Sequence, residues 1–389
     1  MTQTVKRETK SSSIVKIVAI LSAIVAGLSF LSFLLNPEGI LSRGLSFFFF
    51  ILAVIAGGTI IALVSAAIWM KQAKGNSGFK KYIIVVFIIS IISVSGVVIS
   101  QVRQRAQYQT IDVEGIERQY RMYIPRSYDG VEAVPLLLAL HGGMGSAQQF
   151  EKQTGFNEIA ERNGFIVVYP DGLGVFKYSL HVWNSGYIRA GIVQNTDDIL
   201  FLYTLIKHLQ TTYRIDLSRI YMTGHSNGGM MTYRMGGEHA EIFAAIAPVS
   251  AAIGGYASPE SPYYQIPTPT QPLSVVHVHG RLDKNVLYDG GETQEGINKG
   301  RRDVSVNESI AFWVTQNNCS KTPIVEQSVN AKVILTKYVN GTDRSEVNLV
   351  TILNQNHYWD NMNRDVASER FYGQSLAEMI WTLLKQYSK

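Results

Sequence analysis

The stretch from Ile220 to Met231 constrains the fold of this chain more than any other. A short apolar run, Ile220–Thr223, leads into Gly224-His225-Ser226-Asn227-Gly228 and then into a helix-forming segment. This pattern fits G-x-S-x-G, the nucleophile elbow, in which a serine lies on a tight turn between a buried strand and a helix. Glycine at both ends lets the strand and the helix approach closely. The alternative, from the pattern alone, is a glycine-rich turn with an ordinary capping serine.

Short apolar runs on both sides of this stretch alternate with amphipathic segments. The runs predict buried strands at 135–140, 165–169, 220–223, 244–249 and 273–278, and the amphipathic segments predict helices at 148–163, 196–213, 304–315 and 367–387. Strands that alternate with helices form a parallel sheet, and active sites in such sheets lie at the carboxyl ends of the strands. We therefore expect an α/β fold, a mostly parallel sheet flanked by helices, over residues 108–389.

Residues 1–105 have a different character, with apolar runs at 14–35, 45–70 and 82–100. Each run is long enough to cross a hydrocarbon core of about 30 Å as a helix. We therefore predict a membrane anchor with three transmembrane helices and a lipid bilayer as a partner. A cleaved signal peptide is the alternative for the first run, but the run is long for one and two more runs follow.

The positive charge of the chain is concentrated in this anchor. Residues 1–105 hold 11 Lys and Arg against 2 Asp and Glu, whereas the rest holds 24 against 28. The basic residues flank apolar runs and do not form one patch, so no nucleic-acid partner is expected. Lysines at 71–81 and basic residues at 6–10 orient both segments toward the cytoplasm by the positive-inside rule. The predicted location is a multi-pass cell-membrane protein with residues 108–389 outside.

A serine nucleophile needs a base, and the base needs an acid that fixes its tautomer. In α/β-hydrolases the acid and then the histidine follow the serine along the chain. His357 lies beyond the elbow and after a later strand, and Asp283 directly follows a buried strand. We therefore predict Ser226, Asp283 and His357 as the catalytic residues. No metal or cofactor is expected, because His277 and His279 alternate along one strand without a third ligand.

Three loops are candidates for contact with a substrate. The loop His141–Ser146 follows a strand and can turn backbone N–H groups toward a substrate oxygen, or it is a glycine-rich turn without chemistry. The loop 173–195 contains Trp183, and the Pro/Tyr-rich segment Gly254–Pro272 contains Tyr256. This last segment is either a substrate wall or lid, or an ordered surface excursion.

Two further features are assigned structural roles. Asp197 and Asp198 lie at a predicted helix start, where acidic residues cap the helix and match its dipole. The single cysteine, Cys319, cannot form an intrachain disulfide and is expected to be a buried or neutral thiol.

The C-terminal domain resembles the polyhydroxybutyrate depolymerase and feruloyl esterase group of α/β-hydrolases over about residues 108–389. The resemblance is carried by His141-Gly142-Gly143, Tyr169-Pro170-Asp171-Gly172, Trp183-Asn184, the extended elbow Ile215–Met230, and His279-Gly280 with Asp283. It implies an α/β-hydrolase fold and the cleavage of carboxylic esters through an acyl-enzyme, with Ser226 as nucleophile, Asp283 as acid and His357 as base. It also implies an oxyanion hole formed by the N–H groups of Asn227 and of Gly143 or Met144.

One departure from the group lies at the last histidine. The group has Gly-Gly-His-x-Trp-Pro there, whereas this chain has Gln355-Asn356-His357-Tyr358-Trp359-Asp360. The aromatic residue two places after the histidine is retained, so Trp359 joins Trp183 and Tyr256 as a candidate for substrate binding.

The combined expectation is a membrane-anchored, outward-facing serine hydrolase acting on a small-molecule or polymeric ester. Two alternatives stay open. One is an acyltransferase or peptidase that uses the same triad, and the other is a catalytically inactive envelope-binding domain.

Overall fold

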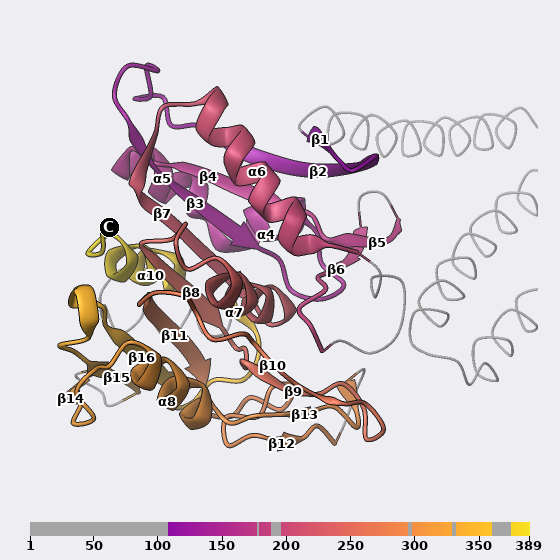
Figure 1. The fold of residues 1–389 in the computed structure, drawn as a ribbon, viewed down its shortest axis with the longest axis vertical. Coiled ribbons are helices and arrows are strands. Elements are labelled where there is room, and N and C mark those ends of the chain that lie inside the picture. Colours follow the sequence, from indigo (N-terminus) through magenta and orange to yellow (C-terminus); the bar gives the residue numbers. More distant parts are fainter. Residues whose placement is uncertain (1–107, 177–178, 188–195, 295–297, 329–331, 360–374) are drawn as a thin grey trace, which may run out of the picture. The chain divides into compact units, whose positions relative to one another are not determined.

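The computed structural model describes residues 108–176, 179–187, 196–294, 298–328, 332–359 and 375–389 (Figure 1). The chain divides into two compact units, Met1–Ala106 and Gln107–Lys389, and all described residues belong to the second. The apolar runs at 14–35, 45–70 and 82–100 lie outside the described residues. Among the residues that are described, no helix combines the length and the apolar character that crossing a bilayer requires.

A ten-stranded sheet forms the centre of the second unit. Its central strands run parallel, in the order β4 (Ile166–Pro170), β3 (Val134–Leu140), β7 (Ile215–His225), β8 (Ala245–Val249), β11 (Ser274–Gly280) and β16 (Val347–Ile352). Antiparallel strands extend both edges: β2 (Ile116–Tyr123) and β1 (Gln109–Val113) beside β4, and β15 (Val333–Tyr338) and β14 (Ile324–Gln327) beside β16.

Apolar cores lie on the two faces of this sheet. Along β3, Leu136 and Leu138 belong to one core and Leu137 and Ala139 to the other, because successive side chains of a strand point to opposite faces. The first core is covered by α6 (Asp198–Thr212), α7 (Asn227–Glu238) and α8 (Val306–Gln316), and the second by α4 (Ala147–Thr154), α5 (Phe156–Asn163) and α10 (Leu376–Leu384). A mostly parallel sheet with helices on both faces confirms the expected α/β-hydrolase fold for the described part of the chain (Figure 1).

The single helix predicted over 148–163 is wrong, because two helices occupy this stretch. α4 ends and α5 begins around Gly155, whose φ of 71° is a left-handed value that glycine adopts without strain. The predicted stop at Asn163-Gly164 is confirmed, since Gly164 caps α5 with φ 68°. α10 lies within the predicted 367–387, although residues 360–374 are outside the described residues.

Two small sheets complete the unit. Within Gly254–Pro272, β9 (Gly254–Tyr256) pairs with β10 (Tyr263–Gln265), and β13 (Arg302–Asp303) and β12 (Gly291–Glu292) extend this pair to four strands. The other small sheet is the pair β5 (Leu173–Phe176) and β6 (Ser179–Val182). Elsewhere in the unit, a 3-10 turn, η2, spans Thr342–Arg344. The Pro/Tyr-rich segment is therefore ordered, and its contact with a substrate stays a prediction.

Candidate active site

The predicted elbow joins β7 to α7. β7 ends at His225, α7 begins at Asn227, and Ser226 between them has φ 54° and ψ −120°. This backbone conformation is strained for a residue with a side chain, and it is held by the Ser226 N–H, which donates to the Val249 carbonyl at 2.8 Å. A Cβ on Gly224 would lie 2.3 Å from the Gly228 carbonyl oxygen, so only glycine fits where the strand meets the helix.

Three loops after parallel strands bring the predicted triad together. Ser226 follows β7, Asp283 follows β11 and His357 follows β16. The Nε2 atom of His357 lies 2.8 Å from Ser226 Oγ, and its Nδ1 atom lies 2.7 Å from Asp283 Oδ2. A carboxylate accepts only, so Nδ1 carries the proton and Nε2 is free to accept the serine proton. This tautomer is the one that a general base requires.

The Asp283 carboxylate is buried and accepts hydrogen bonds on both oxygens. Oδ1 accepts the backbone N–H groups of Asn285 at 2.8 Å and Val286 at 2.9 Å. Burial alone would raise the pKa of this carboxyl, but hydrogen bonds from His279 and His357 lower it well below its ordinary range. Asp283 is therefore a permanent anion that can stabilise a protonated His357.

Sequence reasoning missed His225, the second residue of the elbow. Its Nε2 atom lies 2.7 Å from the His357 carbonyl oxygen, and the two rings are 4.9 Å apart. Burial lowers the pKa of His225 to about 3, so the ring is neutral and donates this hydrogen bond. The bond ties the elbow to the loop of the base. The available signal was that His225 directly precedes Ser226, but the G-x-S-x-G pattern accepts any residue at that position.

The predicted oxyanion loop packs directly on the elbow. A Cβ on Gly143 would lie 3.5 Å from the Cβ of Asn227, and one on Gly142 would lie 3.7 Å from that of Ser226. The Gly145 N–H closes a turn onto the Gly142 carbonyl at 3.0 Å, and Met144 at the third position has φ 65°. A type II turn needs a positive φ there.

Two kinds of N–H group in this region suit an oxyanion. The Asn227 N–H, at the first position of α7, has no acceptor within the helix. Within the described residues, the N–H groups of Gly143 and Met144 also have no hydrogen-bond acceptor. The structure thus places these three residues beside Ser226, and their role in binding an oxyanion stays a proposal.

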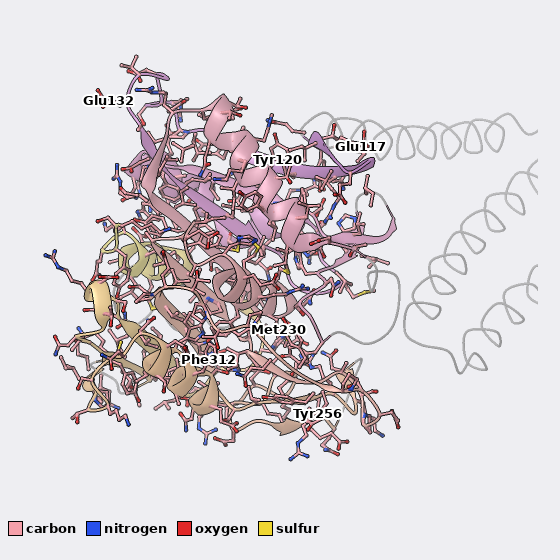
Figure 2. The ribbon with its side chains drawn as sticks, in the orientation of Figure 1. Glu117, Tyr120, Glu132, Met230, Tyr256 and Phe312 are labelled. Carbon is pink, nitrogen blue, oxygen red and sulfur yellow. The ribbon has the colours of Figure 1, made fainter. Side chains whose placement is uncertain are left out.

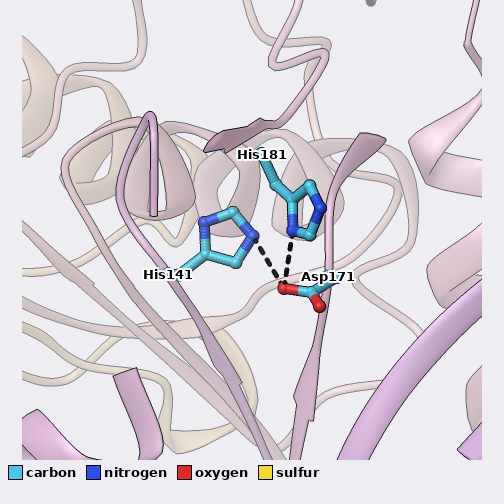
Figure 3. A group of neighbouring side chains, drawn as sticks. All are labelled: His141, Asp171 and His181. Carbon is cyan, nitrogen blue, oxygen red and sulfur yellow. Dashed lines mark ion pairs between the residues drawn. The ribbon is translucent and has the colours of Figure 1, made fainter. Parts of the chain in front are cut away.

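A buried polar cluster of His141, Asp171 and His181 holds the ends of this loop (Figure 3). Asp171 Oδ1 accepts the Ala147 N–H at 2.5 Å and lies 3.0 Å from His181 Nδ1. The backbone N–H of His181 in turn donates to the Gly145 carbonyl at 3.0 Å. His141, Asp171 and His181 come from three different segments of the chain, and the hydrogen bonds of this cluster hold the loop in place.

The same cluster has the residue types of a metal site, but His141 Nε2 and Asp171 Oδ1 each already accept a hydrogen bond from a backbone N–H group. The Gly172 N–H donates to His141 Nε2 at 3.1 Å, and the Ala147 N–H donates to Asp171 Oδ1. Both N–H groups point at the atoms that a cation would need, and they would repel it. Burial also lowers the pKa of His141 to about 4, so the ring is neutral. The arrangement favours a hydrogen-bonded brace.

Two of the predicted substrate contacts are not supported by their burial. Trp183 and Trp359 have no exposed surface. The Trp183 indole donates to the His141 carbonyl at 3.0 Å, and Trp359 packs edge-on against Phe150. Both are corrected to core residues that support the loops of the site. Tyr256 is 37% exposed on the small sheet and remains a candidate (Figure 2).

Comparison with known proteins gives this geometry a family context. Residues 118–261 match the family described as esterase PHB depolymerase. The expected resemblance is confirmed. Feruloyl esterase B of Piromyces equi is 28% identical over 209 residues, 51% of this chain and 35% of its own length. Acetylxylan esterase of Coprinopsis cinerea is 27% identical over 220 residues, 53% of this chain and 57% of its own length.

Among solved structures, the acetyl xylan esterase from Aspergillus awamori aligns with a TM-score of 0.48 and 16% identity over 71% of this chain and 99% of that one. The chain spans less than two thirds of the length of these curated relatives.

Proposed function

We propose that the protein hydrolyses carboxylic esters with Ser226 as nucleophile, His357 as base and Asp283 as the acid that orients it. One observation carries the proposal: the hydrogen-bonded series from Ser226 Oγ through His357 to Asp283, with distances of 2.8 and 2.7 Å. The likeness to named esterases supports an ester as the bond that is cleaved.

In the first half of the reaction, Ser226 Oγ attacks the ester carbonyl carbon while His357 Nε2 takes the hydroxyl proton. The carbonyl oxygen becomes an anion, which the N–H groups of Asn227 and of Gly143 or Met144 stabilise. The imidazolium ring stays in place because its Nδ1–H donates to the Asp283 anion. The tetrahedral intermediate then collapses: the bond to the alcohol oxygen breaks, the alcohol leaves with the proton from His357, and the acyl group stays on Ser226.

In the second half, water takes the place of the alcohol. His357 accepts a proton from the water, the hydroxyl attacks the acyl carbon, and the bond to Ser226 Oγ breaks as His357 gives this proton to the serine oxygen. The carboxylic acid is released.

Labelling of the full-length chain with a fluorophosphonate tests the nucleophile without knowledge of the substrate. We expect wild type to be labelled covalently, whereas Ser226→Ala is not labelled and loses ester turnover by roughly 10³-fold or more. Ser305→Ala is the matched control, because Ser305 caps α8 and takes no part in the proposed chemistry. Wild type that resists labelling, or Ser226→Ala labelled equally, would support the inactive binding domain instead.

Product analysis separates hydrolysis from acyl transfer. A panel of feruloyl, acetylxylan and 3-hydroxybutyrate esters and a set of peptides is incubated with the full chain, with and without an added alcohol or amine. We expect the free acid to be the main product in both cases. Acyl transfer to the added acceptor as the main product would favour an acyltransferase, and cleavage of peptides alone would favour a peptidase.

We further propose that three transmembrane helices within residues 1–105 anchor the protein, with the hydrolase unit outside the membrane. The support is the length of the apolar runs and the lysines between the second and third. A protease added to intact cells should then release a fragment of the hydrolase unit. Detergent-permeabilised cells are the control, and full protection of that unit in intact cells would contradict the orientation.

A further inference from the structure

Two buried histidines behind the triad have no part in the proposed chemistry. His277 and His279 lie on β11, on one face of the strand, and neither has exposed surface. Their rings are stacked with centroids 5.2 Å apart. Buried polar side chains cost free energy unless their hydrogen bonds are satisfied, so the partners of these rings indicate what they do.

The partners determine which nitrogen of each ring carries a proton. Nε2 of His279 lies 2.9 Å from the Val286 carbonyl oxygen and 3.3 Å from Asp283 Oδ2. Both of these atoms only accept, so Nε2 is protonated and Nδ1 is an acceptor. Nδ1 lies 3.0 Å from Nε2 of His277, which must therefore donate. The remaining nitrogen of His277 accepts from the Tyr233 hydroxyl at 2.7 Å.

The result is a chain of hydrogen bonds that begins at Tyr233 on α7, passes through both histidines and ends at the Val286 carbonyl. The last N–H, that of His279, also lies 3.3 Å from Asp283 Oδ2, so its positive end is beside the carboxylate of the triad. Burial lowers the pKa of His277 well below its ordinary value, which keeps that ring neutral and the direction of the chain fixed.

His279 and His357 share one oxygen of the triad acid. Asp283 Oδ2 lies 2.7 Å from His357 Nδ1 and 3.3 Å from His279 Nε2. The N–H of His279 draws electron density from this oxygen, and its positive end faces the site of the imidazolium charge. Both effects make a protonated His357 less stable than it would be beside a carboxylate that accepted from His357 alone.

We propose that His279 is a positioning residue that sets the basicity of His357 through Asp283, and that His277 fixes the tautomer of His279. This inference rests on the proposed hydrolase function. Without the His279 N–H, His357 should bind its proton more tightly. In a plot of the rate of serine labelling against pH, the acidic limb should then move to higher pH.

The other groups that face these rings keep one charge state over the pH range of interest. His225 is neutral, since burial lowers its pKa to about 3. Arg301, which donates to the Asn285 carbonyl at 2.7 Å, stays charged. Tyr288, edge-on to His279, has a pKa raised by burial. A shift of the acidic limb in the His279 variants is therefore not caused by a change in the charge of one of these groups.

The test measures the rate of fluorophosphonate labelling of the full-length chain against pH. His279→Met removes the donor at similar volume, and His279→Gln keeps an amide N–H at the end of the side chain. We expect the midpoint of the acidic limb to rise by about 0.5 pH unit in His279→Met and to return toward the wild-type value in His279→Gln. Thermal unfolding of each variant shows whether it is folded.

The tautomer itself is a second measurement, which does not depend on the methionine variant. In ¹⁵N spectra of histidine-labelled wild type at neutral pH, the ring signal that is lost in His279→Gln should show a protonated Nε2 and an unprotonated Nδ1.

Each failure has its own outcome. Wild type that is not labelled refutes the proposed function. Labelled wild type with equal midpoints in folded His279→Met, or equal shifts in both variants, refutes the role of His279 and leaves the function intact. A protonated Nδ1 on His279 refutes the direction of the chain and with it the proposal.

Discussion

Replacing Asp283 with asparagine tests whether both oxygens of this carboxylate are needed as hydrogen-bond acceptors. Oδ1 faces the N–H groups of Asn285 and Val286, and Oδ2 faces those of His357 and His279. An asparagine amide would therefore direct its NH₂ group at N–H donors in either orientation. Because a hydrogen bond to a charged acceptor contributes about 1.5–3 kcal/mol, we expect Asp283→Asn to lower the free energy of unfolding by roughly 2–4 kcal/mol. Turnover should fall by roughly 10³- to 10⁴-fold, since His357 loses the partner that fixes its tautomer.

The stability loss should depend on pH in a definite direction. The pKa of Asp283 in the folded state is lowered well below that of an unfolded chain, about 3.9. A carboxyl with a depressed folded pKa stabilises the fold above the unfolded pKa, and this contribution is lost as the pH falls below it. The contribution of the Asp283 carboxylate should thus persist down to about pH 4, and the difference between wild type and Asp283→Asn should narrow below that pH.

Thermal unfolding of the full-length chain measures this difference. With about 2–4 °C per kcal/mol for a domain of this size class, the variant should melt roughly 4–16 °C lower at neutral pH. A difference that persisted unchanged at about pH 3 would refute the reasoning, because Asp283 would then not be the anion that its four N–H neighbours imply. An unchanged melting temperature at neutral pH would refute it equally.

Two further perturbations follow from the same geometry. Asp198→Asn should lower the free energy of unfolding, measured in urea, by about 3–5 kcal/mol, because it leaves the buried Arg118 guanidinium, 2.6 Å from Asp198 Oδ1, without its counter-ion. Asp197→Ala removes only the N-cap of α6, so it should lower the free energy of unfolding by about 1 kcal/mol. Equal losses in Asp198→Asn and Asp197→Ala would contradict the buried pair of Arg118 and Asp198. Gly228→Ala should abolish fluorophosphonate labelling, because its Cβ would lie 2.3 Å from the His141 carbonyl oxygen, and a variant labelled at the wild-type rate would contradict the close contact.

The features that could be predicted from the sequence are those with a local pattern and a topological consequence. The strand, serine turn and helix at Ser226 are encoded within a dozen residues. Asp283 and His357 each directly follow a strand, and parallel strands bring their carboxyl ends to one edge of the sheet. The structure therefore brings these three side chains together, although nearly 60 residues separate the first two. The N-cap at Asp197 is likewise a local pattern, and its side chain accepts the Leu200 N–H at 2.8 Å.

Features without a local pattern were missed or misassigned. An aromatic residue in a polar loop predicts contact with a ligand and packing in a core equally well. Trp183 and Trp359 are buried completely, and their rings pack against His141 and Phe150 respectively. Asp198 was expected only to match the helix dipole, but it pairs with Arg118 on β2, 80 residues away. The apolar spacing of 148–163 continues across Gly155, so it did not reveal the break between α4 and α5.

The histidines show why this limit is physical. A histidine in a sequence is a base, a ligand or a packed ring, and its tautomer decides which. In this chain, the tautomers of His277, His279 and His357 are set by Tyr233, Val286 and Asp283, which three-dimensional contact alone brings to them. The elbow can be predicted because the spacing of its glycines and serine is also what places the serine on the tight turn that its chemistry requires. The protonation of the groups behind it could not be predicted, because that depends on acceptors whose neighbourhood exists only once the sheet has formed.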